Sequence, residues 1–309
     1  MKIYKEDIKK KNKKNWRNIM SHDKRLFSAV LKMVGIVIGV IFGILFIIAK
    51  MKKKNSIYED EKDQKNLMEG KRVLFVENLE EPENADGVRG HLEAIGTTKN
   101  RRSFYDCFWK RVIDIILSFC GLVILFPVYL VIMLAIFIDD PGPVLFTQKR
   151  IGRNKAYFKL HKFRSMKMST PHDRPTHMLE NPEQYITRVG KFIRAHSLDE
   201  LPQIWDIFIG NMSVIGPRPA LWNQDLLIAY RDEYGANDIK PGLTGWAQIN
   251  GRDELEIPEK AKLDGIYAAE LRKGGLAALK IDVKCFFGSI GVFIKDKGVV
   301  EGGTGEMGK

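Results

Sequence analysis

The sequence has little cysteine: three residues in 309 are too few to staple a chain of this size. A disulfide-rich secreted protein is therefore excluded. The sequence also lacks a Walker loop, a dinucleotide-binding glycine fingerprint, zinc-ligand spacing and a serine-hydrolase elbow. With 45% apolar residues the chain is not disordered as a whole, and it is long enough to bury a sizeable core.

Most of the chain has no excess of charge of either sign. Residues 1–54 hold 15 Lys and Arg against three acids, and so account for the whole net charge of +12. A basic protein suggests a nucleic-acid partner when its charge is spread over a folded surface. Here the charge belongs to a basic N-terminal arm, residues 1–32, and to the end of an apolar run. We therefore expect no nucleic-acid partner.

That apolar run, residues 33–49, contains no charged side chain and is bounded by Lys32 and Lys50. As a helix it would reach roughly 26 Å, near the lower limit for crossing a bilayer. Further lysines follow it instead of the small residues of a signal-peptide cleavage site, so we expect a retained transmembrane anchor rather than a buried helix. Glycines repeat along it every four residues, which would suit packing against another membrane helix in a homodimer.

A second apolar run, residues 112–138, contains one charge, Asp114, and one proline, Pro127. As a straight helix it would reach roughly 40 Å, more than a bilayer core requires. Pro127 removes a backbone hydrogen bond and bends the helix. The run is therefore either a kinked helix that crosses the bilayer or a broken one that enters and returns to the same face.

Between the two runs, residues 50–102 are polar, and we expect a solvated linker with one short strand at 71–76. From residue 103 onward the chain is globular but irregular, and residues 301–309 form a tail. Short strands are expected at 144–147 and 156–160, around a turn that contains Gly152. Helices are expected at 186–195, 201–209, 222–230 and 257–271. The last expected helix, 277–294, has a pattern that suits either a membrane surface or the core.

Two polar segments stand out as candidates for chemistry. In the first, Ser197 to Pro202, adjacent acids Asp199 and Glu200 begin a predicted helix. Ser197 and Glu200 could simply form a capping box. Alternatively, adjacent acids diverge by about 100° on a helix, so one could ligate a metal while the other faces a substrate.

In the second segment, Gly216 to Pro219, two prolines hold Arg218 in an extended backbone, and its rigid fork of donors suits a phosphate. The alternative is a turn with an exposed arginine. Bases interleaved with aromatics at 149–164, including Lys162, suit nucleic acid, lipid phosphates or a plain solvated face. The glycine-rich segment 240–252 is either a ligand-binding loop or an ordinary one.

Taken in order, these segments resemble the bacterial sugar transferase family, the monotopic phosphoglycosyl transferases. The resemblance runs from about Phe104 to Gly298. It is carried by KRVID at 110–114, DPGPV at 140–144, QKRIG at 148–152, KFRSM at 162–166, TRVG at 187–190, SLDELPQ at 197–203, NMSVIGPRP at 211–219 and PGLTGWAQ at 241–248.

The resemblance implies transfer of a phospho-sugar from a UDP-sugar to a polyprenyl phosphate such as undecaprenyl phosphate, with release of UMP, as the first membrane step of surface glycan or exopolysaccharide assembly. It implies that Asp199 is the nucleophile and forms a covalent phospho-sugar, and that Glu200 helps to bind Mg²⁺. Lys162 and Arg218 would lie near the substrate phosphates. Asp264 matches an acidic family position whose role is less defined.

The resemblance also implies a fold: a small, irregular, mixed α/β domain over 103–300, associated with the membrane. Its membrane helix, 110–139, would be re-entrant and broken at Pro127, surface amphipathic helices would accompany it, and the transmembrane anchor would precede it. The lipid bilayer is then a partner, and the catalytic domain lies on the cytoplasmic face of the cell membrane.

Two other functions fit the sequence less well. One is a non-covalent membrane transferase that uses Asp199 and Glu200 only to hold a metal. The other is a non-catalytic, membrane-anchored glycan-assembly protein whose functional part is the basic arm. The sequence does not identify the transferred sugar.

Overall fold

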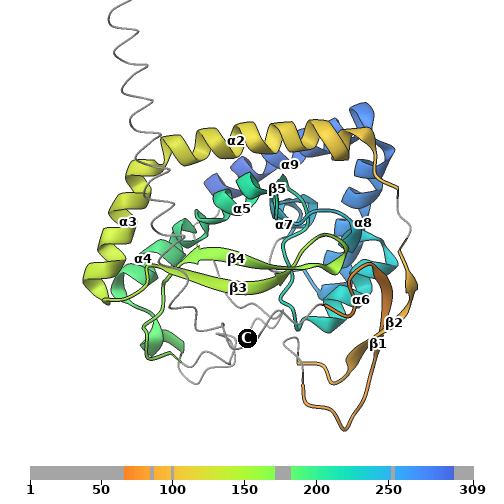
Figure 1. Ribbon diagram of the computed structural model, residues 1–309, viewed down its shortest axis with the longest axis horizontal. Helices are drawn as coiled ribbons and strands as arrows, with labels where there is room; N and C mark the ends of the chain where they lie inside the picture. The colour runs from red at the N-terminus through yellow and green to blue at the C-terminus, as the bar shows by residue number, and fades with distance from the viewer. Residues whose placement is uncertain (1–65, 84–86, 99–100, 171–181, 252–254, 296–309) are drawn as a thin grey trace, which may run out of the picture. The chain divides into compact units, whose positions relative to one another are not determined.

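The computed structural model describes residues 66–83, 87–98, 101–170, 182–251 and 255–295, which all belong to one compact unit. The basic arm, the apolar run at 33–49 and the tail lie outside the described residues. The unit mixes helices with three separate two-stranded sheets, none of which closes on itself (Figure 1). The prediction of a mixed helix-and-strand domain is therefore confirmed.

The second apolar run forms two helices that follow a short π-helical segment, η2 (Tyr105–Trp109). They are α2 (Lys110–Ile124) and α3 (Phe126–Asp139), and Pro127 lies in the first turn of α3. No single helix among the described residues is both long and apolar enough to cross a bilayer, but residues 105–124 and 126–139 qualify by length and composition as a pair bent by 60°. The break predicted at Pro127 is confirmed.

An antiparallel hairpin runs below α2 in Figure 1. It consists of β3 (Leu145–Ile151) and β4 (Tyr157–Phe163), joined by η3 (Arg153–Lys155). Both strands are longer than predicted, and their turn contains Gly152, as expected. After the hairpin the chain forms η5 (Pro182–Tyr185), α4 (Arg188–Ala195), η6 (Leu198–Glu200) and α5 (Gln203–Ile209). Of these, η6 and α5 contact β4.

The C-terminal half surrounds a parallel pair of three-residue strands, β5 (Ser213–Ile215) and β6 (Gly242–Thr244). Its helices are α6 (Asp225–Glu233), η7 (Ala236–Asp238), α7 (Trp246–Ile249), α8 (Ile257–Lys273) and α9 (Gly275–Lys295). The helix α6 begins three residues later than predicted, because the Gln224 side chain accepts a hydrogen bond from the Leu221 amide and holds a turn there.

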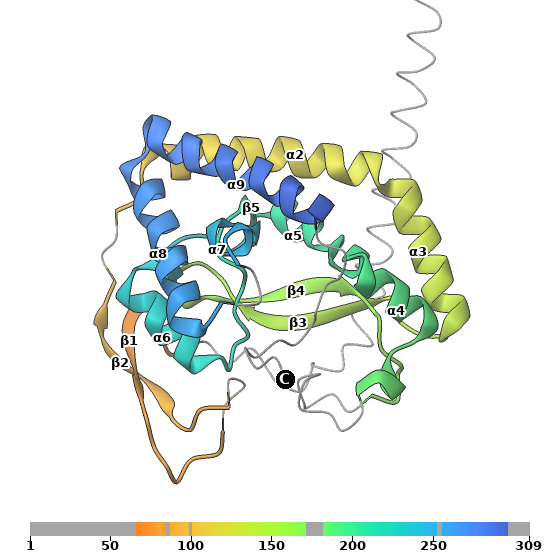
Figure 2. The same ribbon diagram turned by 180° about the vertical axis from the view of Figure 1, so that it is seen from behind.

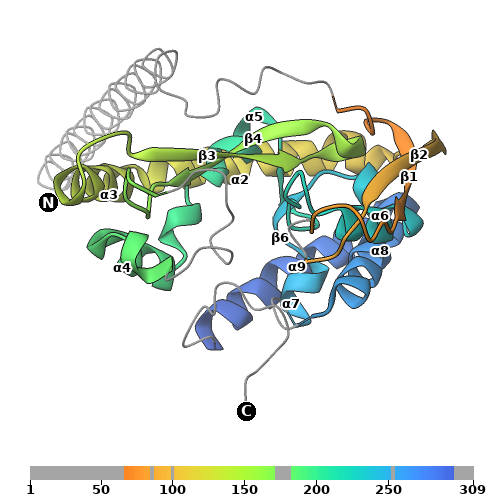
Figure 3. The ribbon, with the colours of Figure 1, turned by 90° about the horizontal axis from the view of Figure 1, so that it is seen from below.

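Helix α9 contacts η2, directly before α2, and diverges from α2 beyond that corner (Figure 2 and Figure 3). One face of α9 belongs to the core through Ala278, Ile281 and Cys285. Apolar side chains elsewhere along α9 remain exposed, among them Leu276, Val283, Phe287 and Ile290. The core interpretation of this segment is therefore confirmed for one face, and the membrane-surface interpretation stays a prediction. Exposed apolar side chains also line α2 and α3.

A second hairpin, β1 (Lys71–Val76) with β2 (His91–Thr97), packs on α6 at the end of the molecule away from α3 and α4 (Figure 3). The strand predicted at 71–76 is confirmed. Its setting differs from the expected solvated linker, because Val73 is buried in a core cluster with Ile151 and Leu227. The hairpin also binds Asp232 through the Val73 amide. This part of residues 50–102 is therefore a folded element of the domain.

Candidate active site

The two predicted acids lie in η6, the short turn between α4 and α5. Ser197 precedes them in the left-handed region at φ 52° and ψ 22°, and its side chain makes no capping hydrogen bond. The capping box is therefore not formed. The turn buries Asp199, which is 5% exposed, and leaves Glu200 partly open.

Contacts from both sides fix this turn. The hydroxyl of Tyr129 on α3 donates to the carbonyl of Leu201, directly after the acids, at 2.5 Å. In α5, Asp206 is fully buried and accepts hydrogen bonds from the backbone amide of His161 on β4 (2.9 Å) and from its ring Nδ1 (2.7 Å). The turn is thus clamped between the broken helix and the β3–β4 hairpin.

Two cations converge on Glu200. Lys162 Nζ lies 3.0 Å from Glu200 Oε1 and 3.7 Å from Asp199 Oδ2. Arg218 places its two terminal nitrogens on the two oxygens of Glu200, Nη2 to Oε1 at 2.5 Å and Nη1 to Oε2 at 3.2 Å. Arg218 therefore binds through two nitrogens, as its fork geometry predicts, but its partner here is the Glu200 carboxylate and not a phosphate. The structure brings together four predicted site residues, which come from β4, η6 and the segment after β5.

The charge state of Glu200 follows from these contacts. Burial by itself would raise the pKa of this carboxyl, but Arg218 and Lys162 hold the pKa well below its usual range. Glu200 is consequently an anion throughout the neutral range, and its charge is shared between two cations. The side chain of Arg218 is 46% exposed, so this cation is the one that solvent or a ligand reaches.

The segment that carries Arg218 is held by close backbone packing. The Gly216 amide donates to Thr244 O, and the Gly242 amide donates to Pro217 O, each at 2.8 Å. A Cβ atom added to Gly242 would lie 2.0 Å from the Gly216 nitrogen, so neither strand-end glycine tolerates a side chain without backbone movement. Glycine here serves close approach of two chain segments.

Two further arginines donate hydrogen bonds to backbone carbonyls of this segment. Arg231 donates to the carbonyl of Arg218 at 3.0 Å, and Arg150 donates to the carbonyl of Pro219 at 2.9 Å. Burial, together with the Arg218 charge, lowers the pKa of Arg150 to about 9, so it is still a cation at neutral pH. Arg150 lies inside a motif that was singled out in the sequence. No pattern marked Arg231.

Asp264 is not brought next to the acids. It lies on α8, 1% exposed, and one of its oxygens accepts two hydrogen bonds from Arg231, at 2.9 and 2.6 Å. Burial raises the pKa of Asp264, and Arg231 opposes that rise. Through Arg231 this carboxylate supports the main chain of Arg218. A direct contact of Asp264 with a substrate stays a prediction.

A site for Mg²⁺ has to be judged from the donors present. Among the residues described, no group of three or more His, Cys, Asp or Glu side chains gathers to hold a metal ion. Mg²⁺ does not require such a cage, because it usually keeps several waters and binds one or two carboxylates together with substrate phosphates. Asp199 and Glu200 fit that requirement. The oxygens of Glu200 already accept from Lys162 and Arg218, so an ion there would compete with these cations.

Paired carboxylates flanked by a lysine and an arginine are suited to a phosphorylated substrate. The family model for bacterial sugar transferase matches residues 105–296, and the chain belongs to this family. The family resemblance drawn from the sequence is thus confirmed.

Individual relatives agree with this assignment. The UDP-glucose:undecaprenyl-phosphate glucose-1-phosphate transferase of Escherichia coli is 40% identical over 160 residues, covering 49% of this chain and 33% of the relative. The exopolysaccharide production protein PSS of Rhizobium leguminosarum is 34% identical over 194 residues, 60% of this chain and 94% of the relative. The undecaprenyl-phosphate galactose phosphotransferase of Salmonella typhimurium is 33% identical over 175 residues, 52% and 36% of the two chains. This chain thus spans about a third of the E. coli and Salmonella proteins.

Proposed function

We propose that this protein transfers a sugar 1-phosphate from a UDP-sugar to a polyprenyl phosphate such as undecaprenyl phosphate, and releases UMP. The observation that carries the proposal is the position of Asp199 and Glu200 against Lys162 and Arg218, on a turn bound to the broken apolar helix. The names of the E. coli and Salmonella relatives support the donor, the acceptor and the reaction. The name of the Rhizobium relative supports a place in exopolysaccharide production.

In the first step, an oxygen of Asp199 attacks the phosphorus that carries the sugar. The bond from that phosphorus to the bridging oxygen of the diphosphate breaks, the electron pair stays on that oxygen, and UMP leaves. An acyl phosphate between Asp199 and the sugar 1-phosphate remains. Lys162 is 3.7 Å from Asp199 and is placed to offset the negative charge that builds up during attack.

In the second step, a phosphate oxygen of the lipid attacks the same phosphorus. The bond to Asp199 breaks, the carboxylate is regenerated, and a polyprenyl diphosphate sugar is released. A covalent intermediate separates the two anionic substrates in time, so the site never has to hold both against each other.

Arg218 has to change partners in this scheme. Glu200 now neutralises its guanidinium, and because the arginine is half exposed, an arriving diphosphate can take the place of the carboxylate. Glu200 would then have one oxygen released by Arg218 with which it could hold Mg²⁺, while Lys162 still donates to the other. When bound, the ion supplies further neutralisation of the diphosphate charge.

The membrane setting is part of the proposal. The acceptor is a lipid, and the bent pair of α2 and α3 carries exposed apolar side chains such as Ile116, Ile124, Val131 and Ile138. We propose that this pair is re-entrant and that the domain lies on the cytoplasmic face of the cell membrane. The turn that carries Asp199 is bound to Tyr129 of the pair, so the two phosphates would meet at the headgroup level.

Trapping the intermediate tests the proposal. The full-length protein in detergent is incubated with UDP-glucose or UDP-galactose bearing a radiolabel on the sugar, first without acceptor. We expect UMP release that stops near one equivalent, with label on the peptide that contains Asp199, and discharge of that label on addition of undecaprenyl phosphate. UMP release that requires the acceptor and leaves no label would instead identify a non-covalent transferase. No UMP from any UDP-sugar would favour a non-catalytic assembly protein.

A further inference from the structure

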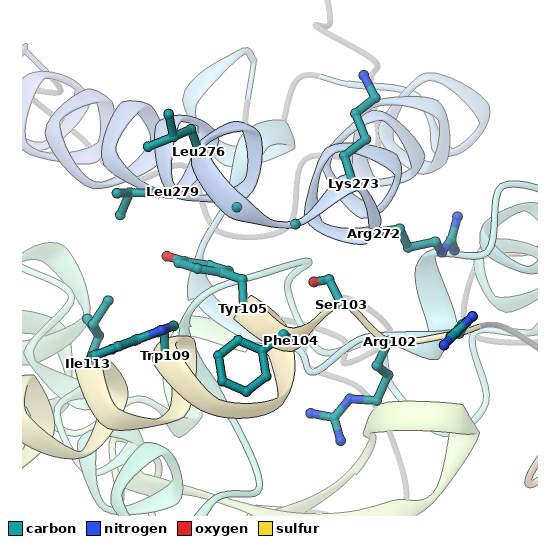
Figure 4. Close-up of a pocket in the computed structure, with 13 residues that line it drawn as sticks. Arg102, Ser103, Phe104, Tyr105, Trp109, Ile113, Arg272, Lys273, Leu276 and Leu279 are labelled. Atoms are coloured by element: carbon teal, nitrogen blue, oxygen red, sulfur yellow. The ribbon is translucent and has the colours of Figure 1, made fainter.

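A cavity of about 810 Å³ lies where the start of the broken helix meets the corner between α8 and α9. One wall is formed by η2, the first turn of α2 and the residues before them, and the other by the end of α8 and the first turn of α9. Figure 4 shows side chains from both walls around one open space. The cavity is away from Asp199, whose turn is bound to α3, beyond the other end of α2.

The lining is divided into two chemically different ends (Figure 4). Figure 4 places Arg102, Arg272 and Lys273 toward one end, from both walls, and Arg101 is a fourth basic residue of the lining. Asp106, Asp238 and Glu270 pair with Arg102, Arg272 and Lys273 in turn. The other end is apolar and includes Trp109, Ile113, Leu276 and Leu279. Such a division matches a molecule with a negatively charged head and a hydrocarbon tail.

The apolar side chains at this cavity are unusually exposed for their size. Phe104 is 71% exposed, Trp109 is 52% exposed and Leu276 is 84% exposed. They continue the exposed apolar side chains of α2, which the proposed function places against lipid, and those of α9. Exposed aromatics beside arginines are typical of the level at which headgroups meet acyl chains.

The walls of the cavity are held by specific contacts. Ser103 donates to the carbonyl of Leu271 at 2.7 Å, which ties the two walls together. Tyr105 donates to Asp282 of α9 at 3.0 Å, and Lys110 binds the same carboxylate at 2.8 Å. Arg272 donates to Gly235 O at 2.6 Å, which fixes its guanidinium. The space is thus a built feature of the fold.

Positive charge is in excess on the neighbouring side of the same segment. A smaller cavity of about 210 Å³ is lined by five basic residues and two acids: Arg102, Asp106, Lys110, Arg111, Asp114, Arg153 and Lys240, beside Cys107. Burial, then the charges of Arg111 and Arg153, lower the pKa of Lys240 to about 8. Arg102 lines both cavities. Asp106 pairs with Arg102 and Arg153, and Asp282 pairs with Lys110, so the excess of positive charge that an anion would meet comes mainly from the remaining bases, such as Arg111, whose hydrogen bonds within the described part of the chain go to backbone carbonyls only.

We propose that the larger cavity binds one anionic phospholipid of the bilayer, with its phosphate at the basic end and an acyl chain along Trp109 and Leu276. This inference rests on the membrane setting of the proposed function, but it concerns a lipid that is not a substrate. Such a lipid would fasten the start of α2 to α9 and set the depth of the domain at the membrane surface.

Quenching of tryptophan fluorescence tests this proposal without any turnover. Full-length protein is placed in phosphatidylcholine vesicles that contain a small fraction of phosphatidylglycerol with brominated chains, or of brominated phosphatidylcholine. The signal of Trp109 is obtained by subtracting the Trp109→Phe variant. We expect saturable quenching of Trp109 by brominated phosphatidylglycerol, with half-saturation at about a tenfold lower fraction than for brominated phosphatidylcholine.

Charge variants provide the matched comparison. Arg101→Gln with Lys273→Gln removes two exposed cations from the basic end and should abolish most of the preference for phosphatidylglycerol. Lys71→Gln with Arg72→Gln removes the same charge from exposed positions on β1 and should leave the preference intact. An equal loss in both variants would show a general surface-charge effect and would overturn the proposal.

Competitors identify the occupant. Soluble glycerol phosphate should not displace the brominated lipid, because it lacks the tail, and displacement by it would show a plain anion site. Undecaprenyl phosphate should compete no better than phosphatidylglycerol, and stronger competition would assign the cavity to the acceptor. UMP release is measured in parallel: turnover without selective quenching contradicts this inference alone, and selective quenching without turnover contradicts the proposed function alone.

Discussion

The two neighbouring acids differ in their surroundings. Glu200 is partly open and accepts hydrogen bonds from both Lys162 and Arg218, whereas Asp199 is buried and has Lys162 Nζ 3.7 Å from Oδ2. A carboxylate whose two oxygens both bind cations is suited to hold charge in place. These contacts support Glu200 as the acid that organises the site, and the role of Asp199 as nucleophile stays a prediction.

Replacing Asp199 by Asn should remove the nucleophile while preserving the volume and much of the hydrogen bonding. We expect UMP release to fall by at least about 10³-fold and the labelled adduct to disappear. Single-turnover release of UMP in detergent measures this. Glu259→Gln, an exposed acid on α8, is the control and should turn over normally. Wild-type turnover by the Asp199→Asn protein would refute the assignment.

Arg218 offers a second test, because its fork is what reaches both oxygens of Glu200. Arg218→Lys keeps the charge but loses the two-pronged geometry, whereas Arg218→Gln loses both. We expect kcat/KM for the UDP-sugar to fall about tenfold in the lysine variant and about 10²–10³-fold in the glutamine variant. Equal losses in the two variants would mean that the fork geometry, and not the charge, is the contribution of this residue, and a lysine variant with wild-type kcat/KM would mean the reverse.

The acids and the cations that flank them could be named from the sequence, because each lies in a compact motif. Their mutual arrangement could not, since Lys162, Glu200 and Arg218 meet only in the tertiary structure. The hydrogen bond from Arg231 to the Arg218 carbonyl, and the pairing of Arg231 with Asp264, were not predicted for the same reason. Arg231 and Asp264 lie 33 residues apart, and neither belongs to a sequence pattern that implies pairing. The alternative in which Ser197 and Glu200 form a capping box is wrong, because Ser197 adopts a left-handed backbone conformation and its side chain makes no capping hydrogen bond.

At the scale of elements, the bend between α2 and α3 has more than one cause. Pro127 removes a backbone hydrogen bond, and polar contacts then hold α3 in its bent direction. Asp139 accepts from the Val189 amide at 2.8 Å, and Asp140 pairs with Arg164 at 3.2 Å. Together with the Tyr129 hydroxyl, these contacts tie α3 to the turn and helix that follow the hairpin.

Pro127→Ala should therefore keep the bend. Straightening regains one backbone hydrogen bond, about 1 kcal/mol, but breaks three polar contacts worth roughly that much each. Spin labels on exposed Cys107 and on Ile138→Cys, in a Cys120→Ser background, report the outcome. A straight helix would lengthen the separation by about 6 Å, and we expect a change well below that. A full lengthening would mean that the proline alone makes the bend.

Tyr129→Phe tests whether α3 also positions the acids. The variant loses the hydrogen bond to Leu201 O and should lose about 1 kcal/mol of stability. Because that carbonyl follows Glu200 directly, we expect kcat to fall more than KM rises, by about tenfold. A Phe163→Leu variant changes the ring packed against Tyr129 but keeps the hydroxyl, and should lose stability with less effect on kcat.

Prediction of the elements succeeded where a periodic pattern was long. Both strands of the β3–β4 hairpin and the helices α4, α8 and α9 follow their patterns. The β5–β6 pair was not predicted, because three-residue strands leave no periodicity, and their parallel pairing depends on glycines that approach across the chain. Of the β1–β2 hairpin, β1 was predicted but β2 was not, because the residues of β2 are exposed or only partly buried and show no alternation of apolar and polar side chains.

At the scale of the whole molecule, this hairpin is joined to the catalytic part through a buried ion pair. Lys155, at the tip of the β3–β4 hairpin, pairs with Asp232 of α6 at 2.7 Å, and both side chains are almost fully buried. The second oxygen of Asp232 accepts from the Val73 amide at 2.7 Å, and the Asn66 side chain binds the Lys155 carbonyl. Removing the hairpin would leave a buried carboxylate with one oxygen unpaired.

Two truncations separate the anchor from the hairpin. Deleting residues 1–65 removes none of these contacts, so the protein in detergent should keep its stability and its rate of UMP release. Deleting residues 1–100 also removes Val73 and its hydrogen bond to a buried charge. The two losses cost about 1.5–3 kcal/mol each, against a typical total stability of 5–15 kcal/mol. Urea unfolding followed by tryptophan fluorescence measures the difference, with full-length Val73→Ala as an intermediate case. If the two truncated proteins unfold at the same urea concentration, the hairpin contributes nothing to the domain, and residues 66–98 act as the linker that their composition suggests.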